Sequence, residues 1–272
     1  MPLAAPREFV RTLRPAMLQA SAIAAALEGR VPNVPKPDEH TAVKAALTIA
    51  DTAAQEALLV PLAKRFREAQ LEAEEDTRSV ALFGGGAADR RIVIDPIDGT
   101  FHFYLGALGP YAVMAGLADD GVYCAALLAL PREGWLFEAV RGEGARRRRL
   151  PAGGSSRCGV TRGGNGLLLS DGVSERVAQR LRDRGWDVAR GCGGAVAVAP
   201  LLPGFRGGLR IAKSVSISTR GRIGLLIAAE AGAIVTTAAG DAFPTAIDAH
   251  ADSVVVASDA EVAAAIRDAL AD

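Results

Sequence analysis

Residue types that mark several classes of protein are scarce in this chain of 272 residues. It has only three cysteines, and Cys124, Cys158 and Cys192 lie far apart. An odd number without close spacing argues against a disulfide framework and against a zinc site, and it fits a reducing compartment. We therefore expect the protein to be cytoplasmic.

Net charge and long apolar runs are also missing. The 31 lysines and arginines balance 31 aspartates and glutamates, so the composition indicates neither nucleic acid nor a membrane surface as a partner. The arginine run 146–149 lacks the interleaved aromatic residues of a nucleic-acid patch. No apolar run is long enough to cross a bilayer. The apolar residues, 50% of the chain, suffice for one large domain or two small ones.

The segment 91–100, Arg-Ile-Val-Ile-Asp-Pro-Ile-Asp-Gly-Thr, carries the clearest chemical signal. Its β-branched residues 92–94 predict a short buried strand that ends at Asp95. The proline that follows fixes one backbone dihedral, and the glycine allows a sharp bend. Asp95 and Asp98 would then share one tight turn beside the carbonyl of Ile97. Two carboxylates and a carbonyl on a rigid loop suit a hard divalent cation such as magnesium.

Simpler interpretations of this segment explain less of it. Asp-Pro and Asp-Gly are common turn dipeptides, so either pair alone would indicate no more than a turn. The complete string directly after an apolar strand is far more specific. Phosphatases with an aspartyl nucleophile place one residue between two aspartates that follow a strand. Here two residues separate Asp95 from Asp98, so the second carboxylate would not reach the same position.

The string from Asp95 to Thr100 resembles the signature of the inositol monophosphatase family, whose members are magnesium-dependent, lithium-sensitive phosphomonoesterases. The resemblance implies an α+β fold, a layered αβαβα sandwich. Its N-terminal half, residues 1–145, would hold helices, an antiparallel sheet and the metal site. A smaller C-terminal α/β half, residues 146–272, would set substrate specificity. Relatives are commonly homodimers, and we expect the same here.

The resemblance also implies a metal-binding glutamate before the central strand. The family has a Gly-Glu-Glu turn there, and residues 74–76 match it with Ala73 in place of the glycine. Glu74 would bind metal and help to orient the attacking water, and Glu75 is the alternative if the register shifts by one residue. Such an acidic run is otherwise usually a solvated surface.

A helix expected from about Thr48 to Phe66 opens with the family's Thr-x-Ala-Asp element. Asp51 would then support the metal site from behind or bind a third metal ion. It is equally consistent with an aspartate that favours a helix N-terminus through the helix dipole.

The turn after the second aspartate is expected to bind phosphate. Gly99 and Thr100 open a helix or loop whose backbone N–H groups favour a phosphate, and Thr100 matches the family hydroxyl that holds the nucleophilic water. His102 stands where the family has asparagine, and it either contacts substrate or fills that polar position. Gly193 and Gly194 match a turn that contacts substrate hydroxyls in the family, although they lack its hydroxyl side chain.

One departure from the family pattern affects the predicted metal site. Counting back from the helix that ends at residues 230–232, Glu-Ala-Gly, the family's Trp-Asp pair falls on Thr219 and Arg220. The missing aspartate ligates the second metal in the family. Two unit charges about 4 Å apart interact by roughly 4 kcal/mol at an effective dielectric constant near 20, and like charges repel by that amount. A cation here would therefore weaken that metal, or Arg220 would clamp the phosphate itself.

More basic side chains surround this position in the sequence. They are expected either to select an additional anionic group on the substrate or to form an ordinary basic surface. These residues are Arg206, Arg210, Lys213 and Arg222.

The sequence thus predicts a Mg2+-dependent phosphomonoesterase that acts on a small phosphorylated metabolite. The resemblance implies a substrate like inositol monophosphate, and relatives with the same first-half motifs process histidinol phosphate, sugar bisphosphates or 3′-phosphoadenosine phosphates. Glu74, Asp95 and the Ile97 carbonyl would bind one ion, and Asp95 and Asp98 would hold a second less firmly. Glu74 and Thr100 would orient the water. The alternative is a catalytically impaired member of the family that binds an anionic ligand or regulates a partner.

Overall fold

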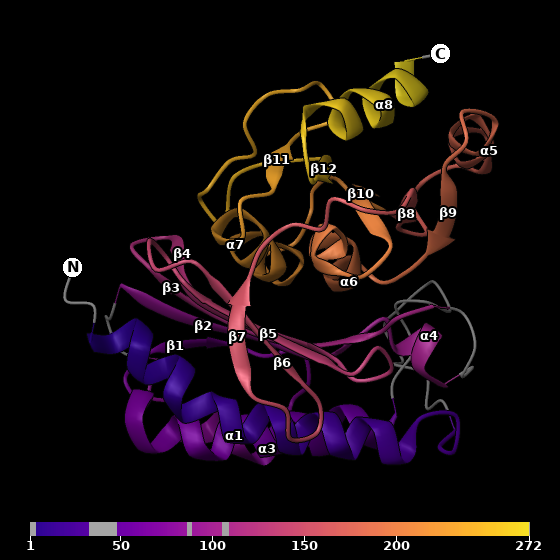
Figure 1. The fold of residues 1–272 in the computed structure, drawn as a ribbon. Coiled ribbons are helices and arrows are strands. Elements are labelled where there is room, and N and C mark those ends of the chain that lie inside the picture. Colours follow the sequence, from indigo (N-terminus) through magenta and orange to yellow (C-terminus); the bar gives the residue numbers. More distant parts are fainter. Residues whose placement is uncertain (1–3, 33–47, 86–88, 105–108, 272) are drawn as a thin grey trace.

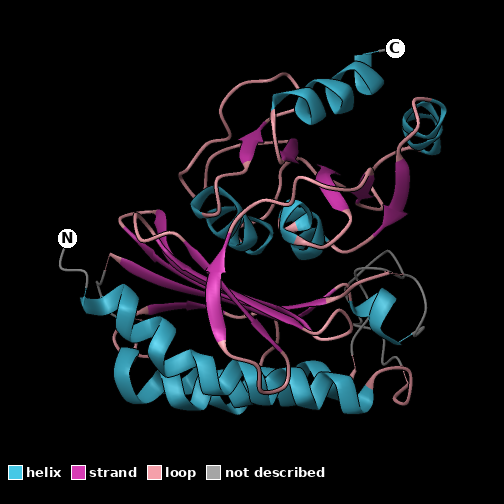
Figure 2. Cartoon of the chain, in the orientation of Figure 1, coloured by secondary structure: helices cyan, strands magenta, loops and turns pink. Residues whose placement is uncertain are grey.

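Helices and sheets alternate in layers along one direction of the molecule (Figures 1 and 2). The computed structural model describes residues 4–32, 48–85, 89–104 and 109–271. Helices α1 (Ala4–Leu27) and α3 (Ile49–Phe66) form the first layer, on one face of a seven-stranded sheet. Helices α6 (Gly193–Ala197) and α7 (Ile223–Glu230) separate that sheet from a five-stranded one. Helices α5 (Glu175–Asp183) and α8 (Ala260–Ala271) cover the far face.

The larger sheet has its strands in chain order, β1 to β7. Strand β1 pairs with β2 in parallel, and every later neighbour is antiparallel. The strands are β1 (Gln70–Glu72), β2 (Arg90–Asp98), β3 (Ala112–Asp119), β4 (Val122–Leu130), β5 (Trp135–Val140), β6 (Ala145–Arg149) and β7 (Ser155–Cys158).

Both faces of this sheet are buried, which explains why its central strands read as continuous apolar runs. In β2, Ile92 and Ile94 pack with α1 and α3. Val93, which points to the opposite face, packs in a second cluster with residues of α6 and α7. Successive residues of a strand therefore serve two different cores.

The smaller sheet has the order β11-β12-β10-β8-β9. Its two faces pack in separate clusters, one against α5 and α8 and the other against α6 and α7. The strands are β8 (Gly166–Leu169), β9 (Asp187–Arg190), β10 (Phe205–Ile211), β11 (Ile234–Thr236) and β12 (Ser253–Ala257). The remaining described elements are α4 (Thr100–Tyr104) and three 3-10 turns, η1 (Arg78–Leu82), η2 (Ala199–Leu201) and η3 (Arg220–Arg222).

The predicted layered αβαβα fold is confirmed. One local prediction was wrong: strand β2 does not end at Asp95 but continues to Asp98, which pairs with Ala112 after a register shift. A local irregularity, rather than a turn outside the sheet, therefore holds both aspartates. The division of the chain at residue 145 stays a prediction, and the larger sheet runs on to Cys158.

The described cysteines Cys124, Cys158 and Cys192 are all free and buried. Among the helices of the described ranges, none is long and apolar enough to cross a membrane.

Candidate active site

A polar cavity of about 540 Å³ lies where the end of β2 meets the second half of the chain. It is lined by residues from five parts of the fold: the turn after β1, the end of β2 with α4, the turn after β8, the start of α6, and the segment from β10 to η3. The residues of its wall that the sequence analysis named for the site are Glu74, Asp95, Ile97, Asp98, Gly99, Thr100, His102, Gly193, Arg210, Lys213 and Arg220.

The end of β2 is fixed by close contact with the start of α6. Gly99 has a φ of 87°, and a Cβ there would lie 2.6 Å from Cβ of Cys192. The backbone N–H of Gly194 donates to Oδ2 of Asp98 at 2.5 Å. The turn therefore requires glycine at 99, and the second half of the chain holds the Asp98 carboxylate in place.

The negative charge of Asp95 is unfavourable in the folded protein. The residue is 5% exposed, and within the described residues its Oδ1 has no hydrogen-bond partner. Burial raises its pKa well above the ordinary value, and the charges of Glu74 and Asp98 raise it further. A buried, repelled and incompletely bonded carboxylate favours a cation beside it.

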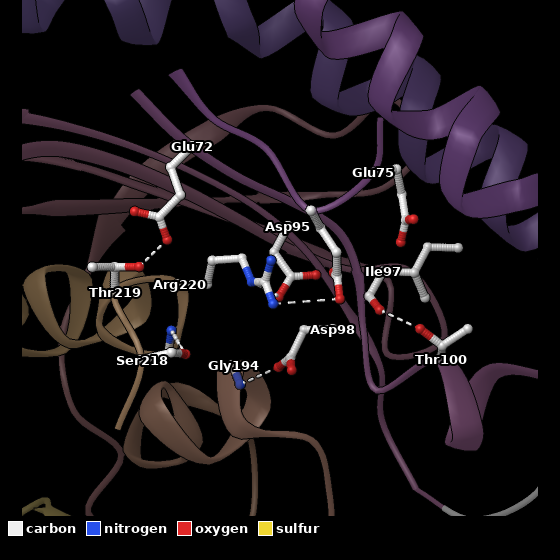
Figure 3. Close-up of polar contacts among 12 residues, drawn as sticks. Glu72, Glu75, Asp95, Ile97, Asp98, Thr100, Gly194, Ser218, Thr219 and Arg220 are labelled. Carbon is white, nitrogen blue, oxygen red and sulfur yellow. Dashed lines mark hydrogen bonds and ion pairs between the residues drawn. The ribbon is translucent and has the colours of Figure 1, made fainter. Parts of the chain in front are cut away.

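Arg220 supplies part of that positive charge. Its Nη2 lies 3.5 Å from Oε1 of Glu74, and its Nε lies 3.6 Å from Oδ2 of Asp95. Figure 3 shows the guanidinium extending into the group formed by Asp95, Ile97 and Asp98. Burial lowers the pKa of Arg220, but the surrounding carboxylates, Asp95 first, more than offset this. Arg220, where the resemblance predicts an aspartate, is thus a charged neighbour of Glu74, Asp95 and Asp98, which together are called the carboxylate cluster below.

The neighbour of Arg220 anchors the same turn to the first sheet. The hydroxyl of Thr219 donates to a carboxylate oxygen of Glu72, at the end of β1 (Figure 3). The sequence offered no signal for this contact, because it joins residues far apart in the chain.

The hydroxyl of Thr100 lies in a chain of hydrogen bonds behind the cluster. Its Oγ1 lies 3.0 Å from the Ile97 carbonyl and 3.1 Å from Oδ1 of Asp51. Oδ2 of Asp51 accepts from the backbone N–H and the hydroxyl of Thr48 in a capping box at the start of α3. Asp51 therefore caps a helix and also contacts the site. Burial raises its pKa to about 6.

The two glutamates proposed for the metal site occupy different surroundings. Glu74 lines the cavity and pairs with Arg220. Glu75 is buried, and its backbone exchanges hydrogen bonds with the side-chain amide of Gln55. Of the two, Glu74 is the one that lines the cavity.

A second charged group forms another part of the wall. Nε2 of His102 donates to Oδ2 of Asp171 at 3.1 Å, and Nζ of Lys213 donates to the same oxygen at 3.3 Å. The hydrogen bond from His102 is the main cause that lowers the pKa of Asp171 to about 2. His102 thus faces the cavity while bonded to the protein. Sequence reasoning missed Asp171, although a polar residue shortly after the buried strand β8 was an available signal.

The four basic residues that the sequence grouped together separate in space. Arg206 pairs with Asp259 at 2.8 Å, outside the cavity. Arg222 is buried and donates to backbone carbonyls between residues 217 and 249. Arg210 and Lys213 line the cavity. Two of the four therefore have structural roles, and two face the cavity.

The carboxylate cluster suits a magnesium ion that keeps waters among its ligands better than an ion that protein side chains enclose completely. Within the described ranges, no three His, Cys, Asp or Glu side chains converge closely enough to hold a metal ion. Magnesium usually takes only one or two carboxylates and keeps waters and substrate phosphates as its other ligands. The unpartnered oxygen of Asp95, beside Asp98 and the Ile97 carbonyl, provides such an open set.

Comparison with known proteins agrees with this geometry. The sequence model of the inositol monophosphatase family matches residues 11–174, more than half of the chain. No curated protein sequence matches the chain significantly.

Similar solved structures support the fold. They include an IMPase from Thermotoga maritima, with a TM-score of 0.75, 19% identity, and coverage of 94% of this chain and 96% of that one. The extragenic suppressor protein SuhB from Bartonella henselae has a TM-score of 0.75 and 18% identity, with coverage of 96% and 97%. An inositol monophosphatase from Anabaena has a TM-score of 0.68 and 19% identity, with coverage of 98% and 96%.

Proposed function

Because the chain belongs to the inositol monophosphatase family of phosphatases, we propose that it is a magnesium-dependent phosphomonoesterase for a small phosphorylated metabolite. The observation that carries the proposal is the buried Oδ1 of Asp95, which has no hydrogen-bond partner among the described residues. The charges of Glu74 and Asp98 repel the charge of this carboxylate. Such an arrangement is costly for stability alone, and a bound cation accounts for it.

Charge balance supports a single ion. Glu74, Asp95 and Asp98 carry three negative charges when ionised, and Arg220 in the same cluster carries one positive charge. One divalent cation neutralises the difference. Asp95, Asp98 and the Ile97 carbonyl would hold it, with Glu74 beside them. When bound, magnesium supplies positive charge for phosphate oxygens and lowers the pKa of a coordinated water.

Thr100 would orient the attacking water. Its hydroxyl proton goes either to Asp51 or to the Ile97 carbonyl, so the lone pairs of Oγ1 remain free to accept a hydrogen bond. Positioning and charge stabilisation dominate phosphoryl transfer, because little covalent chemistry is left for the protein. A hydroxyl held from behind by a buried carboxylate suits that task.

Arg220 would take over part of the second ion's role. The guanidinium stays charged and presents a planar fork that matches phosphate oxygens. Its distances of 3.5 and 3.6 Å to Glu74 and Asp95 are long for hydrogen bonds. It can therefore turn toward an incoming phosphate without breaking short contacts.

The same ion pairs favour a second candidate function. If Arg220 satisfies Glu74 and Asp95 fully, the cluster binds no metal, and the protein binds an anionic ligand without hydrolysing it. The two functions differ in turnover and in metal binding, so one experiment separates them.

The test is phosphate release from a panel of phosphomonoesters, with magnesium and with a chelator. Asp98→Asn removes one carboxylate of the cluster, and Asp120→Asn, in the exposed hairpin between β3 and β4, is the matched control. We expect magnesium-dependent release by the wild type and the control, and its loss in Asp98→Asn. Equal release by all proteins would contradict the proposal, and so would no release from any substrate by folded wild type.

A further inference from the structure

The guanidinium of Arg210 is packed between two glycines in the cavity wall. A Cβ on Gly193 would lie 2.1 Å from its Nη1, and a Cβ on Gly221 would lie 2.4 Å from the same atom. No other residue type fits at either position unless the arginine moves. Two separate turns of the chain therefore leave room for this side chain.

The two glycines also locate Arg210 relative to the candidate active site. Gly193 precedes Gly194, whose N–H donates to Asp98. Gly221 follows Arg220, which pairs with Glu74 and Asp95. The guanidinium of Arg210 thus lies against the two glycines that adjoin Gly194 and Arg220 in the chain. Gly193, Arg210, Arg220 and Gly221 all line the same cavity.

Arg210 has no acidic partner among the residues that the structure describes. Its Nη1 donates a hydrogen bond to the Gly221 carbonyl at 3.4 Å. Arg206 on the same strand pairs with Asp259, and Arg220 pairs with two carboxylates. Arg210 therefore differs from its neighbours in having charge and donors left for a ligand.

Outside the carboxylate cluster and Arg220, the charged lining residues of the cavity are Arg210, Lys213 and Asp171. Asp171 accepts from His102 and pairs with Lys213. Among the described lining residues outside the cluster, no other carboxylate is left to pair with Arg210. A neutral polyol does not require such a cation, whereas an anionic group binds to it.

We propose that Arg210 binds a second anionic group of the ligand, a carboxylate or a phosphate, while the carboxylate cluster engages the phosphate ester. The proposal rests on the proposed function and names its substrate class: a phosphomonoester that carries a further negative charge. The two glycines leave the space that the guanidinium occupies in the cavity wall.

Matched substrates test this specificity. One pair is 3-phosphoglycerate and glycerol 3-phosphate, which differ by a carboxylate in place of a hydroxymethyl group. The other is glucose 1,6-bisphosphate and glucose 1-phosphate, which distinguishes phosphate from carboxylate as the second group. For at least one pair, we expect wild type to have the lower KM for the doubly anionic member. Arg210→Gln is expected to raise that KM about tenfold or more, with kcat little changed.

Two further variants separate recognition from folding. Arg210→Lys keeps the positive charge but loses the planar guanidinium group. Its KM for the doubly anionic substrate should therefore lie between those of wild type and Arg210→Gln. Arg206→Gln removes the same charge from the same strand outside the cavity, and it should keep the wild-type preference. An unchanged KM ratio in Arg210→Gln, or a wild-type preference for the singly anionic member of both pairs, would overturn the proposal.

Calorimetry keeps this test separate from the test of hydrolysis. The four compounds are titrated into the single variant Asp98→Asn and into the double variant Asp98→Asn with Arg210→Gln. Tighter binding of a doubly anionic compound that depends on Arg210 supports the subsite, even if no compound is ever hydrolysed. Hydrolysis without that dependence supports the phosphatase and rejects the subsite.

Discussion

Nε of Arg220 lies 3.6 Å from a carboxylate oxygen of Asp95, and this ion pair joins the second half of the chain to strand β2 of the first sheet. The aspartate is buried and the arginine is half-buried. The pair places a fixed positive charge inside a cluster of carboxylates that otherwise suits metal ions. The following predictions test what that charge does and how the rest of the site depends on it.

Replacing Arg220 by aspartate should strengthen metal binding. The change removes a cation from the cluster and adds a ligand, and charges about 4 Å apart interact by roughly 4 kcal/mol at an effective dielectric constant near 20. We expect Arg220→Asp to bind Mn2+ about tenfold more tightly or to bind an additional ion, as measured by paramagnetic resonance titration. Arg157→Asp, on the exposed part of β7, is the charge-matched control. Identical Mn2+ isotherms for Arg220→Asp and the control would show that Arg220 does not limit metal binding.

Asp95→Asn should stabilise the metal-free protein while it removes the activity. The raised pKa of Asp95 shows that the folded protein disfavours its charge, so an amide of the same shape avoids that cost. We expect the free energy of unfolding in chelator at pH 7.5 to rise by about 0.5–2 kcal/mol. Magnesium should raise the melting temperature of wild type but not of the variant. A variant less stable than wild type in chelator would mean that the ion pair with Arg220 outweighs the burial cost.

Asp51 should make the stability of the metal-free protein depend on pH. Its pKa is about 6 in the folded protein, against an ordinary value of 3.8, so the folded state binds more protons between these values. The free energy of unfolding therefore falls as pH rises from about 4 to about 6. The charges of Glu75 and Glu74 raise the pKa of Asp51 in the same direction as burial does.

Asp51→Asn should flatten that dependence. Urea unfolding of both proteins in chelator at pH 4.5 and 7.5 measures it, with Asp120→Asn as the control in an exposed turn. If wild type and Asp51→Asn lose the same free energy between the two pH values, Asp51 does not titrate in this range.

Gly99→Ala should destabilise the protein more than the same change at Gly121. Both glycines have positive φ, 87° and 69°, so alanine strains the backbone at either position by about 1 kcal/mol or more. Only at Gly99 does a Cβ also collide, at 2.6 Å from Cβ of Cys192, whereas at Gly121 no atom lies within 4 Å. Urea unfolding of the two variants compares these costs directly. Equal losses of stability would show that the approach of α6 to the turn is looser than the structure indicates.

The sequence predicted the residues whose signal is local. Asp95, Asp98 and Thr100 lie on one short string, so the motif itself placed them together, and the structure puts all three in one cavity wall. Asp51 illustrates the limit of such reasoning. Helix capping and contact with the site were treated as alternatives, yet its two carboxylate oxygens serve both purposes.

Contacts between segments that are far apart in the chain could not be predicted from the sequence. The pairing of Arg220 with Glu74 depends on how the second half of the chain packs on the first. The contact of Asp171 with His102 and the two glycines around Arg210 have the same origin. The extension of β2 to Asp98 was missed because an Asp-Pro pair normally indicates a turn, whereas here the strand resumes its pairing after the irregularity.

The most direct test of the account is the rate of phosphate release as a function of magnesium concentration, for wild type and Asp95→Asn prepared in parallel. The account predicts that wild type is inactive in chelator and gains activity along a hyperbolic curve, as expected for one ion, and that Asp95→Asn stays inactive throughout. Activity of wild type that is independent of magnesium, or equal activity of Asp95→Asn, would contradict the central claim.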